Sequence, residues 1–168
     1  MQGKNKELIH VIDDNSFIRE FLSELIENSG YLVQTFPDAK EYIEHISSPD
    51  SKKPLVALVD VIMPSMNGYE MISLIQAKNT GMKFVMMSGE LDIRSDYKNL
   101  ACMYLRKPFY PNCVEKVLKN LSRCSTCGAS SEHGCASVDH RGFYELKNWS
   151  CPDVIEIKLE APFECTTF

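Results

Sequence analysis

The sequence predicts an α/β protein built on a doubly wound, five-stranded parallel sheet, with a small cysteine-rich extension at its C-terminal end. Short apolar runs alternate with segments whose apolar residues recur at helical spacing, the order expected for parallel strands joined by helical crossovers. The run at 55–59 is apolar throughout, as in a central strand covered on both faces. Five of the seven cysteines follow residue 122 in this 168-residue chain. We therefore expect two parts, residues 1–122 and an extension at 123–168.

Each strand is predicted from a short apolar run, and each helix from apolar residues three or four positions apart. The predicted strands, in chain order, are 8–12, 31–36, 55–59, 83–87 and 101–105. The predicted helices are 17–26, 38–46, 69–80, a weakly patterned 91–99, and 111–121. Asn15 can cap the first helix, Gly30 can end it, and Pro111 suits the first position of the last.

Polar side chains follow four of the predicted strands at the point where each strand ends. Asp13 and Asp14 follow the first strand, Asp60 the third, Ser88 the fourth and Lys107 the fifth. Because the carboxyl ends of parallel strands meet at one edge of a sheet, where ligands bind, we expect these side chains to lie together. Taken alone, Asp60 is equally well interpreted as a turn or helix-cap residue.

Three carboxylates gathered in one small site repel one another, and they stay ionised only beside a cation. Oxygen ligands on a loop-built edge suit Mg²⁺, which also leaves room for a phosphate. Lys107 can pair with an incoming anion and Ser88 can donate a hydrogen bond to it. The sequence therefore predicts that a phosphoryl group is transferred to a carboxylate here, by positioning and charge neutralisation.

Together these motifs resemble the receiver domain of bacterial response regulators, the phosphorylated proteins of two-component systems. The resemblance covers residues 5–122 and rests on the acid pair, DVIMPSMNG at 60–68, SGE at 88–90 and RKPF at 106–109. It implies a flavodoxin-like strand order of 2-1-3-4-5 in the receiver part at 1–122. The stretch between Ser88 and Lys107 is shorter than is usual in that family.

The resemblance also implies a role for each residue of the site. Asp60 is then the phospho-acceptor, Asp13, Asp14 and Asp60 with the backbone carbonyl of Ile62 hold Mg²⁺, Ser88 and Tyr104 form the switch, and Lys107 pairs with the phosphate. Members of the family take phosphate from a sensor histidine kinase or a phosphotransfer protein and act on a downstream protein target, in some cases as a homodimer. Such a protein is not an enzyme beyond its own phosphorylation and dephosphorylation.

Charge and hydropathy argue against two other kinds of partner. With 18 Lys and Arg against 23 Asp and Glu, the net charge is -5, which disfavours direct binding to nucleic acid through its phosphates. No apolar run reaches the roughly 18 residues of a membrane span, and the N-terminal segment lacks the apolar core of a signal peptide. We therefore expect a cytoplasmic protein without membrane insertion.

The extension carries half of a metal-binding pattern. Cys124 and Cys127 have the spacing of one half of a structural Zn²⁺ site, and the other ligands would come from Cys135, Cys151, His133 and His140. Because no second pair with that spacing follows, reduced thiols in a small β-rich extension are the alternative. Residues 154–159 alternate in polarity and predict a strand there.

Two other functions compete with signalling by phosphorylation. A metal or redox sensor would use the cysteine-rich extension to receive its signal, with the receiver as a scaffold. A nucleotide-binding enzyme on the same fold would need a glycine-rich loop after the first strand, and the sequence has acids there instead.

Overall fold

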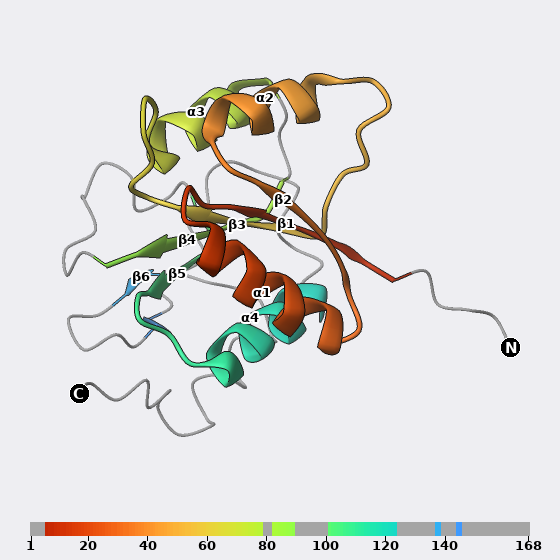
Figure 1. The fold of residues 1–168 in the computed structure, drawn as a ribbon, viewed down its shortest axis with the longest axis vertical. Coiled ribbons are helices and arrows are strands. Elements are labelled where there is room, and N and C mark those ends of the chain that lie inside the picture. Colours follow the sequence, from red (N-terminus) through yellow and green to blue (C-terminus); the bar gives the residue numbers. More distant parts are fainter. Residues whose placement is uncertain (1–5, 79–81, 90–100, 124–136, 139–143, 146–168) are drawn as a thin grey trace, which may run out of the picture.

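A parallel sheet forms the centre of the computed structural model, which describes residues 6–78, 82–89, 101–123, 137–138 and 144–145 (Figure 1). The strands of this sheet are β1 (Leu8–Ile12), β2 (Leu32–Phe36), β3 (Val56–Asp60), β4 (Phe84–Ser88) and β5 (Met103–Arg106). The helices are α1 (Ser16–Asn28), α2 (Ala39–Ser47), α3 (Gly68–Lys78) and α4 (Pro111–Arg123). A further short pair, β6 (Ser137–Val138) and β7 (Tyr144–Glu145), is antiparallel.

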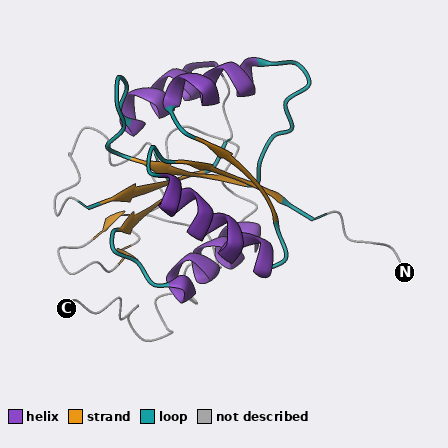
Figure 2. Cartoon of the chain, in the orientation of Figure 1, coloured by secondary structure: helices purple, strands orange, loops and turns teal. Residues whose placement is uncertain are grey.

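The five strands lie in the order β2-β1-β3-β4-β5, and every neighbouring pair is parallel. Helices α2 and α3 cover one face of this sheet, while α1 and α4 pack together on the other (Figure 2). The doubly wound sheet and the strand order implied by the resemblance are therefore confirmed. Since all five strands run in the same direction, their carboxyl ends share one edge.

The central strands are buried on both faces, as the continuous apolar run at 55–59 predicts. Every residue of β3 and of β4 is buried, whereas the edge strand β2 alternates between exposed and partly buried positions before its buried last residue, Phe36. From the helices, Leu22, Tyr42 and Met71 are fully buried against the sheet. Burying each such side chain contributes roughly 1.5–3 kcal/mol, so this core holds the strand ends of the site in place.

Helix α1 is one residue longer at its start and two at its end than predicted, and the predicted cap and stop residues, Asn15 and Gly30, flank it. The side chain of Asn15 caps it by accepting a hydrogen bond from the backbone N–H of Phe17 at 3.0 Å. At the other end Gly30 adopts a φ of 91°, a left-handed conformation that glycine tolerates better than other residues. The entry into α1 from β1 is thus fixed locally, directly after the acid pair.

The bounds of most elements differ from the sequence prediction by one or two residues. Asp60 and Ser88 are the last residues of β3 and β4 rather than the residues after them, since both strands lie one residue further along the chain than predicted. Strand β5 starts two residues later than predicted, at Met103. The predicted helix at 91–99 and the predicted strand at 154–159 lie outside the described residues, as do Cys124, Cys127, Cys135 and Cys151. Of the two cysteines that are described, Cys113 is disulfide-bonded and Cys102 is not.

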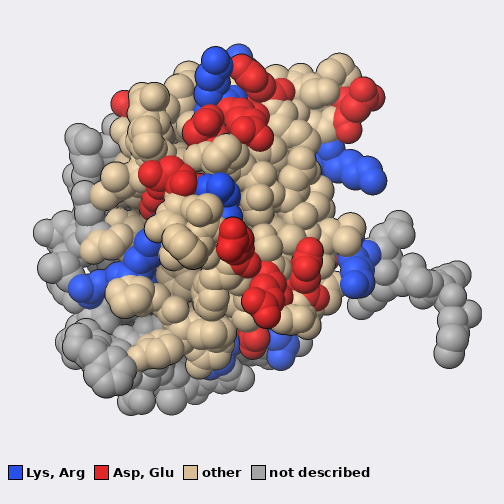
Figure 3. Space-filling model, viewed as in Figure 1, with Lys and Arg blue, Asp and Glu red and all other residues tan. Residues whose placement is uncertain are grey.

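The described surface mixes charges of both signs. Figure 3 shows Lys and Arg side chains interspersed with Asp and Glu, and the described part of this face has no continuous basic stripe. None of the described helices is long and apolar enough to cross a membrane.

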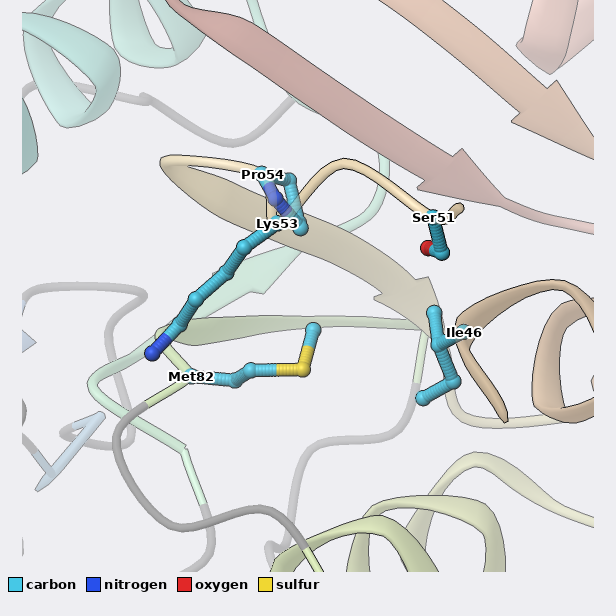
Figure 4. A pocket seen from close by; sticks show the side chains of 5 residues that line it. All are labelled: Ile46, Ser51, Lys53, Pro54 and Met82. Atoms are coloured by element: carbon cyan, nitrogen blue, oxygen red, sulfur yellow. The ribbon is translucent and has the colours of Figure 1, made fainter. Parts of the chain in front are cut away.

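A small pocket of about 150 Å³ lies beside the amino ends of β3 and β4, lined by Ile46, Ser51, Lys53, Pro54 and Met82 (Figure 4). This pocket is therefore at the opposite end of the strands from the carboxylates.

Candidate functional site

Three carboxylates meet at the carboxyl edge of the sheet. Asp60 is the last residue of β3, and Asp13 and Asp14 directly follow β1, the strand paired with β3. One carboxylate oxygen from each lies within 4.8 Å of those from the other two. Asp13 and Asp60 are buried and Asp14 is exposed, so the group opens to solvent on one side. The structure thus brings together the three acids that the sequence places at strand ends.

Lys107 reaches this acidic group from the end of β5. Its ammonium lies 2.7 Å from Asp13 Oδ2 and 3.0 Å from Asp60 Oδ1, so one cation pairs with two carboxylates. The Lys107 backbone N–H donates to the carbonyl of Ser88 at 2.7 Å, which anchors the loop after β5 to the end of β4. The Lys107–Pro108 peptide bond that follows is cis. The two ion pairs and the backbone hydrogen bond to Ser88 hold the Lys107 ammonium against both carboxylates.

Burial and neighbouring charges shift the pKa values of both partners. Burial raises the pKa of the Asp60 carboxyl; Lys107 offsets part of the effect, Asp13 adds to it, and the backbone N–H of Ile62 opposes it. For Lys107, burial alone would lower the pKa, but its hydrogen bond to Asp13 and the charges of both carboxylates outweigh this and raise it. Lys107 is therefore held as a cation. The Asp60 carboxyl would ionise more readily if the charge of Asp13 did not repel it.

The loop between β3 and α3 places the backbone tightly around Asp60. The N–H of Gly68 donates to the carbonyl of Val61 at 3.0 Å, and the N–H of Val61 donates to the carbonyl of Met87. A side chain at Gly68 would collide with the carbonyl oxygen of Asp60, so only glycine fits here without a backbone shift. Ser65, in the same loop, has a left-handed φ of 68°.

Asn67 and Glu70 close the loop with reciprocal hydrogen bonds at the start of α3. The N–H of Glu70 donates to Asn67 Oδ1 at 2.9 Å, and the N–H of Asn67 donates to Glu70 Oε2 at 3.2 Å. This capping arrangement satisfies backbone donors that a helix start otherwise leaves unpaired. It fixes where the loop ends, and hence the path of the backbone past Asp60.

Three further residues of the predicted site are Ser88, Ile62 and Tyr104. Ser88 is buried at the end of β4, beside the anchored backbone of Lys107. Ile62 lies two residues after Asp60 with its side chain 60% exposed, and its N–H, rather than its carbonyl, is the group seen to contact the Asp60 carboxylate. Tyr104 belongs to β5, but its side chain lies outside the described part of the chain.

Two residues near the acid pair are not apparent from the sequence as parts of the site. The N–H of Asn15 donates to Asp13 Oδ1 at 2.9 Å, and Arg19 donates to the backbone carbonyls of both Asp13 and Asp14. The sequence indicates Asn15 only as a helix cap. For Arg19 the one available signal is its position one turn into a helix that starts directly after two acids.

Comparison with known proteins identifies this arrangement. The family profile of the response regulator receiver domain matches residues 9–119, so the chain belongs to this family. An uncharacterized response regulatory protein of Vibrio vulnificus is 30% identical over 124 residues, which are 73% of this chain and 50% of that protein. The DNA-binding transcriptional regulator NtrC of Escherichia coli K12 is 31% identical over 105 residues, 61% of this chain and 22% of NtrC. The chain thus matches half or less of these relatives' lengths.

Solved receiver structures have the same fold. The response regulator TrrA of Thermotoga maritima, in complex with Mg²⁺ and beryllofluoride, is 27% identical with a TM-score of 0.62, covering 68% of this chain and 98% of TrrA. A receiver domain protein of Methanospirillum hungatei is 25% identical with a TM-score of 0.61, covering 70% of this chain and 95% of that protein. In each case the likeness spans nearly the whole of the other structure.

The chain is therefore a receiver domain of a two-component response regulator, followed by additional sequence. Its acidic group of Asp13, Asp14 and Asp60 is typical of the Mg²⁺ sites of such domains. The donor chemistry fits that ion, because three carboxylates converge around one point with an open, solvent-facing side left for water or phosphate.

Proposed function

We propose that Asp60 accepts a phosphoryl group from a sensor histidine kinase or a phosphotransfer protein, and that the phosphorylated chain then acts through contacts with a downstream protein. The observation that carries this proposal is the pairing of Lys107 with both Asp60 and Asp13. A cation held at two carboxylates in the resting protein is already positioned to pair with the charge that the new phosphate brings.

The reaction is a transfer between two nucleophiles. A carboxylate oxygen of Asp60 attacks phosphorus, the bond from phosphorus to the donor imidazole breaks, and the imidazole keeps the electron pair and takes up a proton. Asp13, Asp14 and Asp60 are the residues that would hold Mg²⁺, which would supply positive charge to the phosphoryl oxygens. The backbone of Ile62, in the loop beside Asp60, is the further candidate ligand.

The burial of Asp60 serves this transfer in two ways. A buried carboxylate sheds water that would otherwise compete for phosphorus, and it feels the charge of Lys107 more strongly than it would in solvent. A raised pKa makes the carboxylate a better nucleophile once it is ionised, and the charge of Lys107 favours the ionised form.

Ser88 and Tyr104 would be the residues whose conformation responds to phosphorylation of Asp60. The backbone N–H of Lys107 donates to the Ser88 carbonyl, which joins the ends of β4 and β5 beside the site. We propose that this contact biases two arrangements of the protein, with Ser88 donating to the phosphate in one of them. The extension at 123–168, whose strand β6 contacts β5, would be a small module that contacts a partner or docks on the receiver.

Two other expectations concern a metal or redox sensor and direct binding to nucleic acid. Among the described residues, Asp13, Asp14 and Asp60 are the only group of three or more possible metal ligands, and the cysteines that a metal or redox sensor would use in the extension lie outside these residues. NtrC is a DNA-binding regulator, but this chain matches only 22% of it. We propose protein contacts, rather than direct binding to nucleic acid, as the output of this chain.

The proposal is tested by incubating the full chain with acetyl phosphate and Mg²⁺ and measuring its intact mass. The unaltered protein should gain one phosphoryl group, and Asp60→Asn should gain none. Asp50→Asn makes the same chemical change on an exposed loop and should behave as the unaltered protein. An unchanged mass of the unaltered protein, or labelling that survives Asp60→Asn, would contradict the assignment.

A further inference from the structure

Arg19 holds the backbone of the acid pair from the first turn of α1. Its Nη1 donates to the carbonyl oxygen of Asp13 at 2.7 Å and to that of Asp14 at 3.0 Å. The backbone N–H of Arg19 donates to the carbonyl of Asn15, so the arginine belongs to the helix that the capped turn begins. One guanidinium group therefore connects α1 to two successive peptide units at the end of β1.

The two hydrogen bonds from Arg19 influence the positions of the Asp13 and Asp14 carboxylates. The hydrogen bond to the Asp13 carbonyl restrains ψ of Asp13, and a change in that angle would shift Asp14 relative to Asp13. The Asp13 carboxylate has its own contacts, from the N–H of Asn15 and the ammonium of Lys107. The Asp14 side chain is exposed, and its backbone carbonyl is held by Arg19. Arg19 thus restrains the backbone of the acid whose side chain is exposed.

We propose that Arg19 is a positioning residue for the Mg²⁺ site: by fixing the Asp13 and Asp14 carbonyls, it aims their carboxylates at the ion. This inference rests on the proposed function, since it concerns the metal that phosphoryl transfer to Asp60 requires. The planar, always charged guanidinium suits the task, because it donates to both oxygens in a fixed geometry that a flexible ammonium does not reproduce.

Charge and positioning predict opposite effects of removing Arg19. A guanidinium near the acids repels a divalent cation, so on charge alone its loss would strengthen Mg²⁺ binding. If Arg19 instead aims the carboxylates, its loss weakens binding, as seen for groups that orient metal ligands without touching the metal. The sign of the change therefore separates the two accounts.

A purely structural role for Arg19 makes a third prediction. If the contacts only join α1 to β1, removing them lowers the free energy of unfolding but leaves the Mg²⁺ affinity of the folded protein unaltered. Measuring both quantities on the same variants distinguishes this outcome from positioning.

The experiment uses the full chain with Arg19→Ala, Arg19→Lys and the control Lys40→Ala. Lys40 is an exposed cation on α2, and its ammonium lies 4.0 Å from Glu44 Oε1. Lys40→Ala removes one positive charge, as Arg19→Ala does, but away from the site. Calorimetric titration gives the Mg²⁺ dissociation constant, and urea unfolding without Mg²⁺ gives the stability. Arg19→Ala should raise the dissociation constant about tenfold. Arg19→Lys should fall between it and the unaltered protein, and Lys40→Ala should bind normally.

Equal or tighter Mg²⁺ binding by Arg19→Ala would overturn the inference, as would an equal loss in Lys40→Ala. Treating the same samples with acetyl phosphate separates this result from the proposed function. If the unaltered protein binds Mg²⁺ but accepts no phosphoryl group, the proposed function fails and the Arg19 result stands. If the unaltered protein binds no Mg²⁺, both are overturned.

Discussion

Lys107 and Asp13 are 94 residues apart in the sequence, yet the Lys107 ammonium lies 2.7 Å from Asp13 Oδ2. The same nitrogen is 3.0 Å from Asp60 Oδ1, so Lys107 bridges the carboxylates that follow β1 and end β3. The parallel sheet makes this bridge, because it brings the carboxyl ends of β1, β3 and β5 to one edge. The resting site thereby has its positive charge in place before any phosphate arrives.

Replacing Lys107 should separate metal binding from phosphoryl acceptance. In Lys107→Met the ammonium no longer competes with Mg²⁺ for Asp13 and Asp60, so we expect Mg²⁺ to bind more tightly. The rate of phosphorylation by acetyl phosphate at saturating Mg²⁺ should fall roughly a hundredfold, because the charge that stabilises the transferring group is gone. Calorimetry and intact-mass kinetics measure the two quantities. Lys40→Met, an exposed change on α2, is the control, and weaker Mg²⁺ binding by Lys107→Met would contradict the expectation.

A methyl group at position 68 should disturb the backbone of Asp60. In Gly68→Ala the new Cβ meets the Asp60 carbonyl oxygen and approaches Val59 and Met86, so the loop must shift. Overpacking of this kind costs about 1–3 kcal/mol of the free energy of unfolding, measured by urea denaturation. Gly89→Ala is a matched control, since a Cβ there meets nothing within 4 Å and should alter stability by less than about 0.5 kcal/mol. Equal stability of the two variants would show that the loop has room.

Buried His10 should make the protein less stable in acid. Burial and the nearby His45 lower the pKa of His10 from 6.5 to about 4, with Tyr42 facing its Nδ1 at 3.3 Å. Because the folded pKa is below the unfolded one, protons bind the unfolded chain preferentially. The stabilising contribution is present above pH 6.5 and is lost as the pH falls towards about 4.

The size of this effect can be measured by comparison with His10→Gln. Between neutral pH and pH 4, the free energy of unfolding of the unaltered protein should fall by up to about 3 kcal/mol more than that of the variant. Urea denaturation at several pH values gives both curves. Parallel curves would mean that His10 has the same pKa in the folded and the unfolded chain, which would contradict the prediction.

Much of the sheet could be predicted from sequence because its signals are local. Continuous apolar runs indicate buried strands, and the acids directly after β1 and at the end of β3 needed only the parallel topology to bring them together. The resemblance to receiver domains supplied the roles. Even the late start of β5 changes no residue of the site, because Lys107 still follows the strand.

What could not be predicted depends on contacts between elements. Nothing in the sequence around His10 indicates a partner, yet α2 places Tyr42 against it from 32 residues away. The two hydrogen bonds of Arg19 depend on the helical turn that brings its side chain back over the end of β1. The need for glycine at 68 arises from the approach of that residue to the Asp60 backbone, a distance no local pattern encodes.

The extension yields a prediction that rests on its cysteines alone. If Cys124 and Cys127 contribute to a tetrahedral Zn²⁺ site with Cys135 and Cys151, or with His133 or His140, elemental analysis should find near-stoichiometric zinc in protein made without added metal. The double variant Cys124→Ser with Cys127→Ser should lose that metal and become more sensitive to proteolysis after residue 122. Metal-free protein whose extension resists proteolysis would support docking on the receiver instead.

The most direct test of the central claim is to locate the phosphoryl group on the chain. Protein treated with acetyl phosphate and Mg²⁺ is reduced with borohydride, which converts an aspartyl phosphate to homoserine, and is then digested and sequenced by mass spectrometry. We predict homoserine at position 60 and unmodified aspartates at 13 and 14, because Asp60 is the buried carboxylate at the end of β3 that Lys107 contacts. Homoserine at position 13 or 14, or none in the chain, would contradict the account.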